Sequence, residues 1–168
     1  MAPSSPPRPS DGFDRMTAEA ERTLLAQARA LQRAALAGPP QALLRGKNFG
    51  LLCEAESATG EAAMFRRAAM ELGAHVAHIR ASLSEFSTPQ EVEHTARLLG
   101  RLYDAVECQG MPSTLVQQVG QAVDMPVYDA VASQRHPTAH LADQLGSESP
   151  AEDRRRFVLQ AVLIGSLG

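Results

Sequence analysis

The chain has 168 residues, of which 44% are hydrophobic and 21% are charged, with a formal net charge of -3. This length supports one hydrophobic core, and the acidic and basic residues are interspersed, so we expect no nucleic-acid partner and no anionic membrane partner. No apolar run approaches the roughly 20 residues that span a bilayer, and the first residues lack the layout of a secretory signal, so we expect a cytoplasmic protein.

The N-terminal part of the chain predicts a tail followed by a helix. Residues 1–12 are rich in Pro and Ser, so we expect a disordered tail. Thr17 can cap a helix with Glu19 and Glu21 in its first turn, and Gly-Pro-Pro at 38–40 ends it. One face of this helix is predicted to be buried and carries Leu24, Ala28, Leu31 and Ala35.

The middle of the chain alternates short apolar runs with segments of helical pattern. Strands are predicted at 49–53, 76–79, 105–108 and 127–130, and helices at 60–72, 89–103 and 114–123. A capping box, Thr-Pro-Gln-Glu at 88–91, supports the second of these helices. Such alternation builds a parallel sheet through right-handed crossovers. We therefore predict a single α/β domain at 13–146, a three-layer sandwich with a four-stranded parallel sheet and helices on both faces.

The end of the chain predicts one more helix. A second capping box, Ser-Pro-Ala-Glu at 149–152, opens it, and its apolar run at 157–164 has to be covered. We therefore expect residues 147–168 to form a C-terminal helix packed on the same domain. The basic cluster at its start is interpreted as a solvated face and consists of Arg154, Arg155 and Arg156.

The cysteines and the first histidines offer little chemistry. Cys53 and Cys108 lie in predicted neighbouring strands and, without an export signal, are expected to be reduced core thiols. His75 and His78 lie three apart on or beside a predicted strand, so their side chains point to opposite faces of the sheet. They therefore cannot share a metal.

A second group of possible metal ligands has helical spacing. It consists of His136, His140 and Asp143. Because Pro137 implies that His136 precedes the helix, we interpret His136 as a helix-start histidine and His140 as a surface residue. We expect no metal and no cofactor.

Three segments carry a family resemblance. Residues 44–54 read Leu-Arg-Gly-Lys-Asn-Phe-Gly-Leu-Leu-Cys-Glu, residues 65–76 read Phe-Arg-Arg-Ala-Ala-Met-Glu-Leu-Gly-Ala-His-Val, and residues 136–138 read His-Pro-Thr. The chain resembles the carbamoyl-phosphate domain of the ornithine and aspartate carbamoyltransferases, and segments 100–104 and 159–163 look closer to the ornithine branch. The resemblance implies that the family's second domain is absent here and that its last helix is rejoined near residues 146–149.

The resemblance also implies a ligand site that has lost its cations. The family's Ser-Thr-Arg-Thr-Arg is Ser-Ala-Thr-Gly-Glu at 57–61, its Tyr-Arg-Gly is Cys-Gln-Gly at 108–110, and its His-Pro-Thr-Gln ends in Ala at 139. Losing three arginine contacts removes roughly 5–9 kcal/mol, whereas a micromolar ligand binds with about 8 kcal/mol. Residues 57–60 fit an ordinary helix cap as well. The degenerate site positions are Ser57, Thr59, Gly60, Glu61, Gln109, His136, Thr138 and Ala139, of which His136 could still polarise a carbonyl; none is expected to be catalytic.

Three functions from different classes fit these residues. The first is a non-catalytic carbamoyltransferase-like protein that associates with itself as a trimer or with a complete carbamoyltransferase. The second is a binding module for another small, neutral or cationic ligand near Ser57, Glu61, Gln109 and His136. The third is a residual carbamoyltransferase of ornithine and arginine metabolism that depends on a partner chain. We adopt the first, because the resemblance implies a trimer contact face that here carries Met64, Phe65, Phe86 and Arg97.

Overall fold

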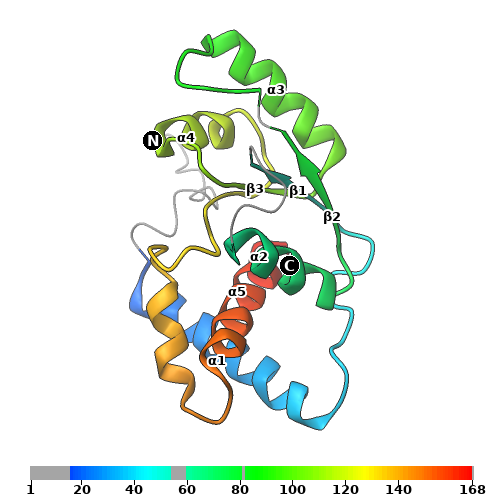
Figure 1. The fold of residues 1–168 in the computed structure, drawn as a ribbon, viewed down its shortest axis with the longest axis vertical. Helices are drawn as coiled ribbons and strands as arrows, with labels where there is room; N and C mark the ends of the chain where they lie inside the picture. Colours follow the sequence, from blue (N-terminus) through cyan, green and yellow to red (C-terminus); the bar gives the residue numbers. More distant parts are fainter. Residues whose placement is uncertain (1–15, 54–59, 81, 168) are drawn as a thin grey trace, which may run out of the picture.

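The computed structural model describes residues 16–53, 60–80 and 82–167 (Figure 1). The predicted tail at 1–12 and the site residues Ser57 and Thr59 lie outside these ranges. Along the chain the elements are α1 (Ala18–Ala37), β1 (Asn48–Leu52), α2 (Gly60–Glu71), β2 (His75–Ile79), α3 (Pro89–Leu102), β3 (Ala105–Cys108), α4 (Ser113–Gln121), β4 (Val127–Asp129), the 3-10 helix η1 (Ala139–Leu145) and α5 (Ala151–Leu167).

The four strands form one parallel sheet in the order β2-β1-β3-β4. Side chains alternate between its two faces: Phe49 and Leu51 point toward α2 and α5, whereas Leu52 and Val106 point toward α3 and α4. Both faces are covered by helices, as a parallel sheet with near-continuous apolar strands requires. The predicted α/β sandwich with a four-stranded parallel sheet is confirmed.

Helices α1 and η1 add a layer that the sequence did not predict. They pack against the side of α5 that faces away from the sheet, and α1 crosses α5 (Figure 1). Leu25, Ala28 and Gln32 of α1 are buried there, whereas Ala35, expected on the buried face, is exposed. The last turn of α1 extends past the helix that it covers, which explains why the predicted stripe ends early.

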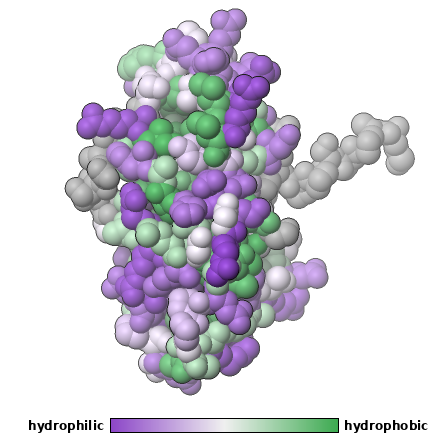
Figure 2. All heavy atoms as spheres, turned by 90° about the vertical axis from the view of Figure 1, so that its right-hand side faces the viewer, coloured by the Kyte–Doolittle hydropathy of each residue, from purple (hydrophilic) through white to green (hydrophobic). Residues whose placement is uncertain are grey.

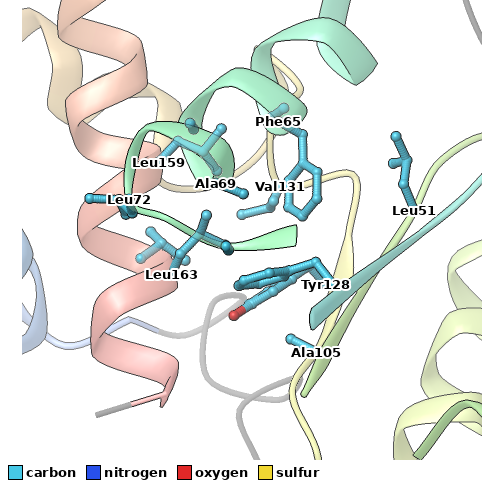
Figure 3. Packing of buried hydrophobic residues seen from close by; sticks show 14 of the residues in the cluster. Leu51, Phe65, Ala69, Leu72, Ala105, Tyr128, Val131, Leu159 and Leu163 are labelled. Atoms are coloured by element: carbon cyan, nitrogen blue, oxygen red, sulfur yellow. The ribbon is translucent and has the colours of Figure 1, made fainter. Parts of the chain in front are cut away.

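Helix α5 is therefore enclosed on all sides. Leu159 and Leu163 join Ala69 and Leu72 of α2 and Tyr128 of the sheet in one cluster (Figure 3). The opposite side of α5 packs on α1 and η1 through Phe157, Val158 and Ala161. The helix begins one residue later than the predicted capping box requires: Pro150 O accepts the first helical bond, from Arg154 N at 3.0 Å, and Ser149 Oγ accepts from Gln32 Nε2 at 3.2 Å.

The interpretation of the basic cluster as a solvated face is wrong. Arg155 and Arg156 are each only 7% exposed. Arg156 donates from Nε to Glu71 Oε2 (2.9 Å) and from Nη1 to Asp153 Oδ1 (2.6 Å). Gln160 Nε2 donates to the same Glu71 oxygen at 3.1 Å. Over its buried stretch α5 has no solvated face, so Arg156 is satisfied by Glu71 at the end of α2 and by Asp153 of α5 instead.

Two further predictions concern residues of the sheet and of α2. Cys53 and Cys108 are buried thiols, as predicted, and they belong to opposite faces of the sheet. Phe65, which we placed on a contact face, lies fully buried in the core, where its ring meets Phe49 edge-on at 5.9 Å. Because that side of α2 packs on the sheet in the hydrophobic core, it is not available to a partner. None of the helices within the described residues is long and apolar enough to cross a membrane.

Strand β3 also carries a fully buried carboxyl group. Glu107 Oε1 accepts a hydrogen bond from Val131 N at 3.1 Å, and among the described residues Oε2 has no hydrogen-bond partner. Burial raises the pKa of Glu107 well above its usual value, although the hydrogen bonds from the backbone of Val131 and Ala132 oppose this shift.

The first prediction concerns the contact between α2 and α5. Glu71→Ala should lower the free energy of unfolding by about 2–3 kcal/mol, because it leaves the buried Arg156 short of a partner. Glu71 also pairs with Arg67, four residues earlier on α2. Glu93→Ala is the matched control, since Glu93 pairs with Arg97, four residues later on α3, but at the surface only, and it should cost less than about 1 kcal/mol. Urea denaturation measures both. Equal losses would show that the contact with α5 contributes nothing.

The second prediction uses the pKa of Glu107. A carboxyl whose pKa is raised on folding stabilises the protein at low pH and loses that contribution as the pH rises above its unfolded value. Glu107→Gln keeps the acceptor for Val131 N and cannot ionise. Its stability relative to the unaltered chain should therefore increase as the pH rises above 4.5, which denaturation at several pH values measures. A flat difference would contradict the shift; Glu93→Gln serves as the control.

Candidate functional site

The predicted site lies where the parallel strands end. The two central strands, β1 and β3, connect to neighbours on opposite sides: β1 to β2 and β3 to β4. In parallel sheets of this kind, ligands bind in the crevice at the carboxyl ends of the two central strands. Gly60 and Glu61 form the first turn of α2, and Gln109 directly follows β3. His136, Thr138 and Ala139 lie in and after the loop that leaves β4.

The structure brings only part of the predicted set together. An open hollow of about 1000 Å³ is lined by Gly60, Glu61 and Ala139, together with Arg155 of α5. His136 lines a second, smaller cavity of about 370 Å³. Gln109 and Thr138 are buried and line neither. The loop after β4 separates the two spaces, because Ser133 and Arg135 line both.

His136 is buried just ahead of η1 rather than at the start of a helix. The backbone N–H of Thr138 donates to His136 Nδ1 at 3.3 Å, and Thr138 Oγ1 lies 2.8 Å from the same nitrogen. Burial, with a smaller effect of the Arg155 charge, lowers the pKa of His136 to about 4. The ring is therefore neutral at pH 7.

Arg155 is a cation near the site that we did not predict from the sequence. Its Nη2 donates to Val131 O (2.8 Å) and to Ser133 O (2.9 Å). Burial lowers the pKa of Arg155, while the carboxylates of Glu107 and Glu61 raise it. One feature of the sequence could have indicated this burial. Three consecutive helical residues span about 200° of the helix circumference. In a helix that other elements cover, at least one of the three arginines therefore has to point inward.

Electrostatics set what the hollow can accept. Glu61 sits in the first turn of α2, where an acid stabilises the helix through its dipole. The same carboxylate stands where a phosphate would need backbone N–H groups and a cation. Arg155 uses Nη2 to hold the loop, and its Nε and Nη1 are buried without a partner among the described residues. Glu61 and Arg155 therefore place charges of opposite sign at this hollow.

The second histidine of the supposed metal group lies elsewhere. His140 Nε2 is 3.6 Å from Glu21 Oε1 of α1, and both side chains are partly exposed. Across residues 16–53, 60–80 and 82–167, no group of three His, Cys, Asp or Glu side chains lies close enough to hold a metal ion.

Known proteins share the sequence of this domain. Residues 12–148 match the family model described as the aspartate/ornithine carbamoyltransferase carbamoyl-P binding domain. The ornithine carbamoyltransferase of Actinobacillus pleuropneumoniae serotype 5b is 38% identical over 122 residues, which are 73% of this chain and 36% of that protein. The catabolic ornithine carbamoyltransferase of Mycoplasma capricolum subsp. capripneumoniae is 38% identical over 127 residues, which are 76% of this chain and 40% of that protein.

Solved structures show the same relationship. The ornithine carbamoyltransferase from Pyrococcus furiosus matches 79% of this chain and 42% of its own with a TM-score of 0.66 and 25% identity. The catalytic subunit of M. jannaschii aspartate transcarbamoylase, at 18% identity and a TM-score of 0.63 over 80% of this chain and 44% of its own, shares the fold. The chain thus spans about two fifths of these relatives. It belongs to the aspartate/ornithine carbamoyltransferase family, through the carbamoyl-phosphate-binding domain.

Proposed function

We propose that this chain is a non-catalytic carbamoyltransferase-like protein that acts by associating with copies of itself, as a trimer, or with a complete carbamoyltransferase. The observation that carries the proposal is that Glu61 and Arg155 line the same hollow. Glu61 stands at the helix N-terminus, and Arg155, a buried cation lining the hollow, uses Nη2 on the carbonyls of Val131 and Ser133. A phosphate dianion would meet a carboxylate there and would gain little from Arg155.

We call the three arginine contacts that the family resemblance implies for phosphate the phosphate clamp. Without this clamp, the surface is the part of the domain that can still carry a function. Phe86 is 87% exposed, and Leu98 and Leu102 are exposed one turn apart on α3. Hydrophobic residues also form several patches, separated by hydrophilic ones, on the face shown in Figure 2. Exposed apolar side chains of this kind support association, and closed cyclic symmetry is its usual form. For the location we propose the cytoplasm, which suits the buried thiols Cys53 and Cys108.

The third prediction tests the lost clamp. Millimolar carbamoyl phosphate should leave the melting temperature unchanged, because a ligand stabilises only in proportion to its binding of the folded state, and no transfer to ornithine should be detected. Glu61→Arg replaces the acid with a cation and should produce a rise with ligand concentration. Glu93→Arg, which makes the same change on the surface of α3, should not. A rise in the unaltered chain would contradict the proposal.

The fourth prediction tests association. Light scattering from micromolar to millimolar protein should give the mass of three chains, or of a complex when a complete carbamoyltransferase is added. Replacing Phe86 and Leu98 together with Ser should lower the association constant at least tenfold, because both side chains would leave an apolar contact. Leu36→Ser is the control, since Leu36 is 70% exposed on α1 at the other end of the fold. A monomeric mass under every condition would remove association as the function.

A further inference from the structure

The outer edge of β2 is the longer of the two free edges of the sheet. β2 has five residues and β4 three, and β2 pairs with β1 on one side only. His75 N donates to Lys47 O at 2.8 Å, so alternate residues from His75 onward are bonded to β1. The N–H and C=O groups of the residues between them, Val76 and His78, therefore point away from the sheet. Among the described residues these groups have no backbone partner on that side.

This edge is open to another strand. β1 and β3 are buried along almost their whole length, whereas in β2 the side chains of His75 and Ala77 are exposed and the other three are half-buried. β2 lies on the right of the sheet in Figure 1, so Figure 2 views the molecule from the side of this edge. Proteins often block a free edge with Pro, Lys or a bulge. β2 contains no Pro and no Lys, and its register with β1 is continuous.

Exposed apolar side chains lie beside this edge on both faces of the sheet. Leu102 is 64% exposed and lies about 200° around α3 from Gly100, which faces Val123 at the end of α4. Because α4 packs on β4 at the opposite edge of the sheet, that side of α3 is turned toward β2. On the other face Met70 is 57% exposed and lies on α2 about 100° from Glu71, the residue that contacts α5. An added strand would thus meet an apolar side chain on each face.

The charges around this edge are basic. Four basic side chains form no salt bridge within the described residues: Arg45 and Lys47 beside the start of β2, Arg66 on α2, and Arg80 directly after β2. Acidic side chains on an added strand would pair with them. A second copy of β2 in antiparallel pairing would instead bring Lys47 of one edge against Arg80 of the other. The charges thus favour an acidic partner over a second copy.

We propose that the outer edge of β2 binds an extended acidic segment of a partner protein as an added strand of the sheet. Val76 and His78 supply the main-chain donors and acceptors, the basic side chains at the two ends of the edge hold the acidic residues, and apolar residues of the segment pack on Leu102 and Met70. The inference does not depend on the proposed trimer, because it rests on a strand edge and not on Phe86.

The test is a titration of the ¹⁵N-labelled full chain at pH 7 with three synthetic peptides. The first is acetyl-Glu-Glu-Val-Val-Val-Glu-Glu-amide, the second has Lys in place of each Glu, and the third is the acidic peptide with methyl groups on two successive valine nitrogens, so that neither of its edges can pair. The acidic peptide should shift the amide resonances of Val76 and His78 until they saturate and should slow their exchange with deuterium. The other two peptides should each bind at least tenfold more weakly.

The contrary outcomes are distinct. Equal binding of the lysine peptide or of the methylated peptide, or no saturable shift with the acidic one, would overturn the proposal. Slow exchange of the Val76 and His78 amides that depends on protein concentration alone would show that a second copy occupies the edge, and would overturn it as well. The chain with both Phe86 and Leu98 replaced by Ser should bind the acidic peptide with unchanged affinity, so loss of association and loss of peptide binding are separable.

Matched substitutions separate the main chain from the charges. Val76→Pro removes one outward N–H without removing a bond to β1 and should weaken binding of the acidic peptide at least tenfold, whereas Val76→Thr keeps that N–H and should change binding less than threefold. Lys47→Gln combined with Arg80→Gln should also weaken binding at least tenfold. Arg22→Gln combined with Arg33→Gln, on exposed positions of α1, is the control and should leave it unchanged. Unchanged affinity in the Lys47 and Arg80 double variant would by itself refute the site, even if Val76→Pro failed to fold.

Discussion

Helix α5 is buried over residues 155–163. At the start of that stretch the end of α2 accepts a hydrogen bond from Arg156, and the loop after β4 accepts from Nη2 of Arg155. The apolar side chains of α5 contact the sheet side of the fold and the α1–η1 layer at once. Its polar side chains tie α2 to the helix through Glu71. The core on one face of the sheet and the α1–η1 layer are thus joined through this one helix.

The same enclosure decides the electrostatics of the candidate site. Arg155 brings a positive charge to the hollow beside Glu61, but its Nη2 is bound to the backbone of Val131 and Ser133. The guanidinium therefore shapes the loop that carries His136 and also lowers the pKa of that histidine. Packing and site chemistry are thus coupled through one side chain, and a charge that stabilises the loop is less available to a ligand.

Local sequence patterns were sufficient to predict the strands of the sheet and most of the helices. The apolar run at Ala105–Cys108 and the capping box before α3 were predicted with their correct bounds at β3 and at the start of α3, since both signals depend on nearby residues. Arg155, Arg156 and Phe65 were misplaced because their burial depends on which element lies opposite, and sequence spacing does not contain that contact. The additional α1–η1 layer was missed for the same reason.

The structure brings together only some of the positions that the sequence assigned to one site. Gly60, Glu61 and Ala139 meet at one hollow, as a crevice at the strand ends implies, whereas His136 turns to a separate cavity on the other side of the loop. The loop can divide the space in this way because it is anchored in the core by Glu107 from β3 and by Arg155 from α5. A buried carboxyl group and a buried guanidinium, neither of which belongs to a recognisable motif, thus produce two spaces where the family resemblance implied one.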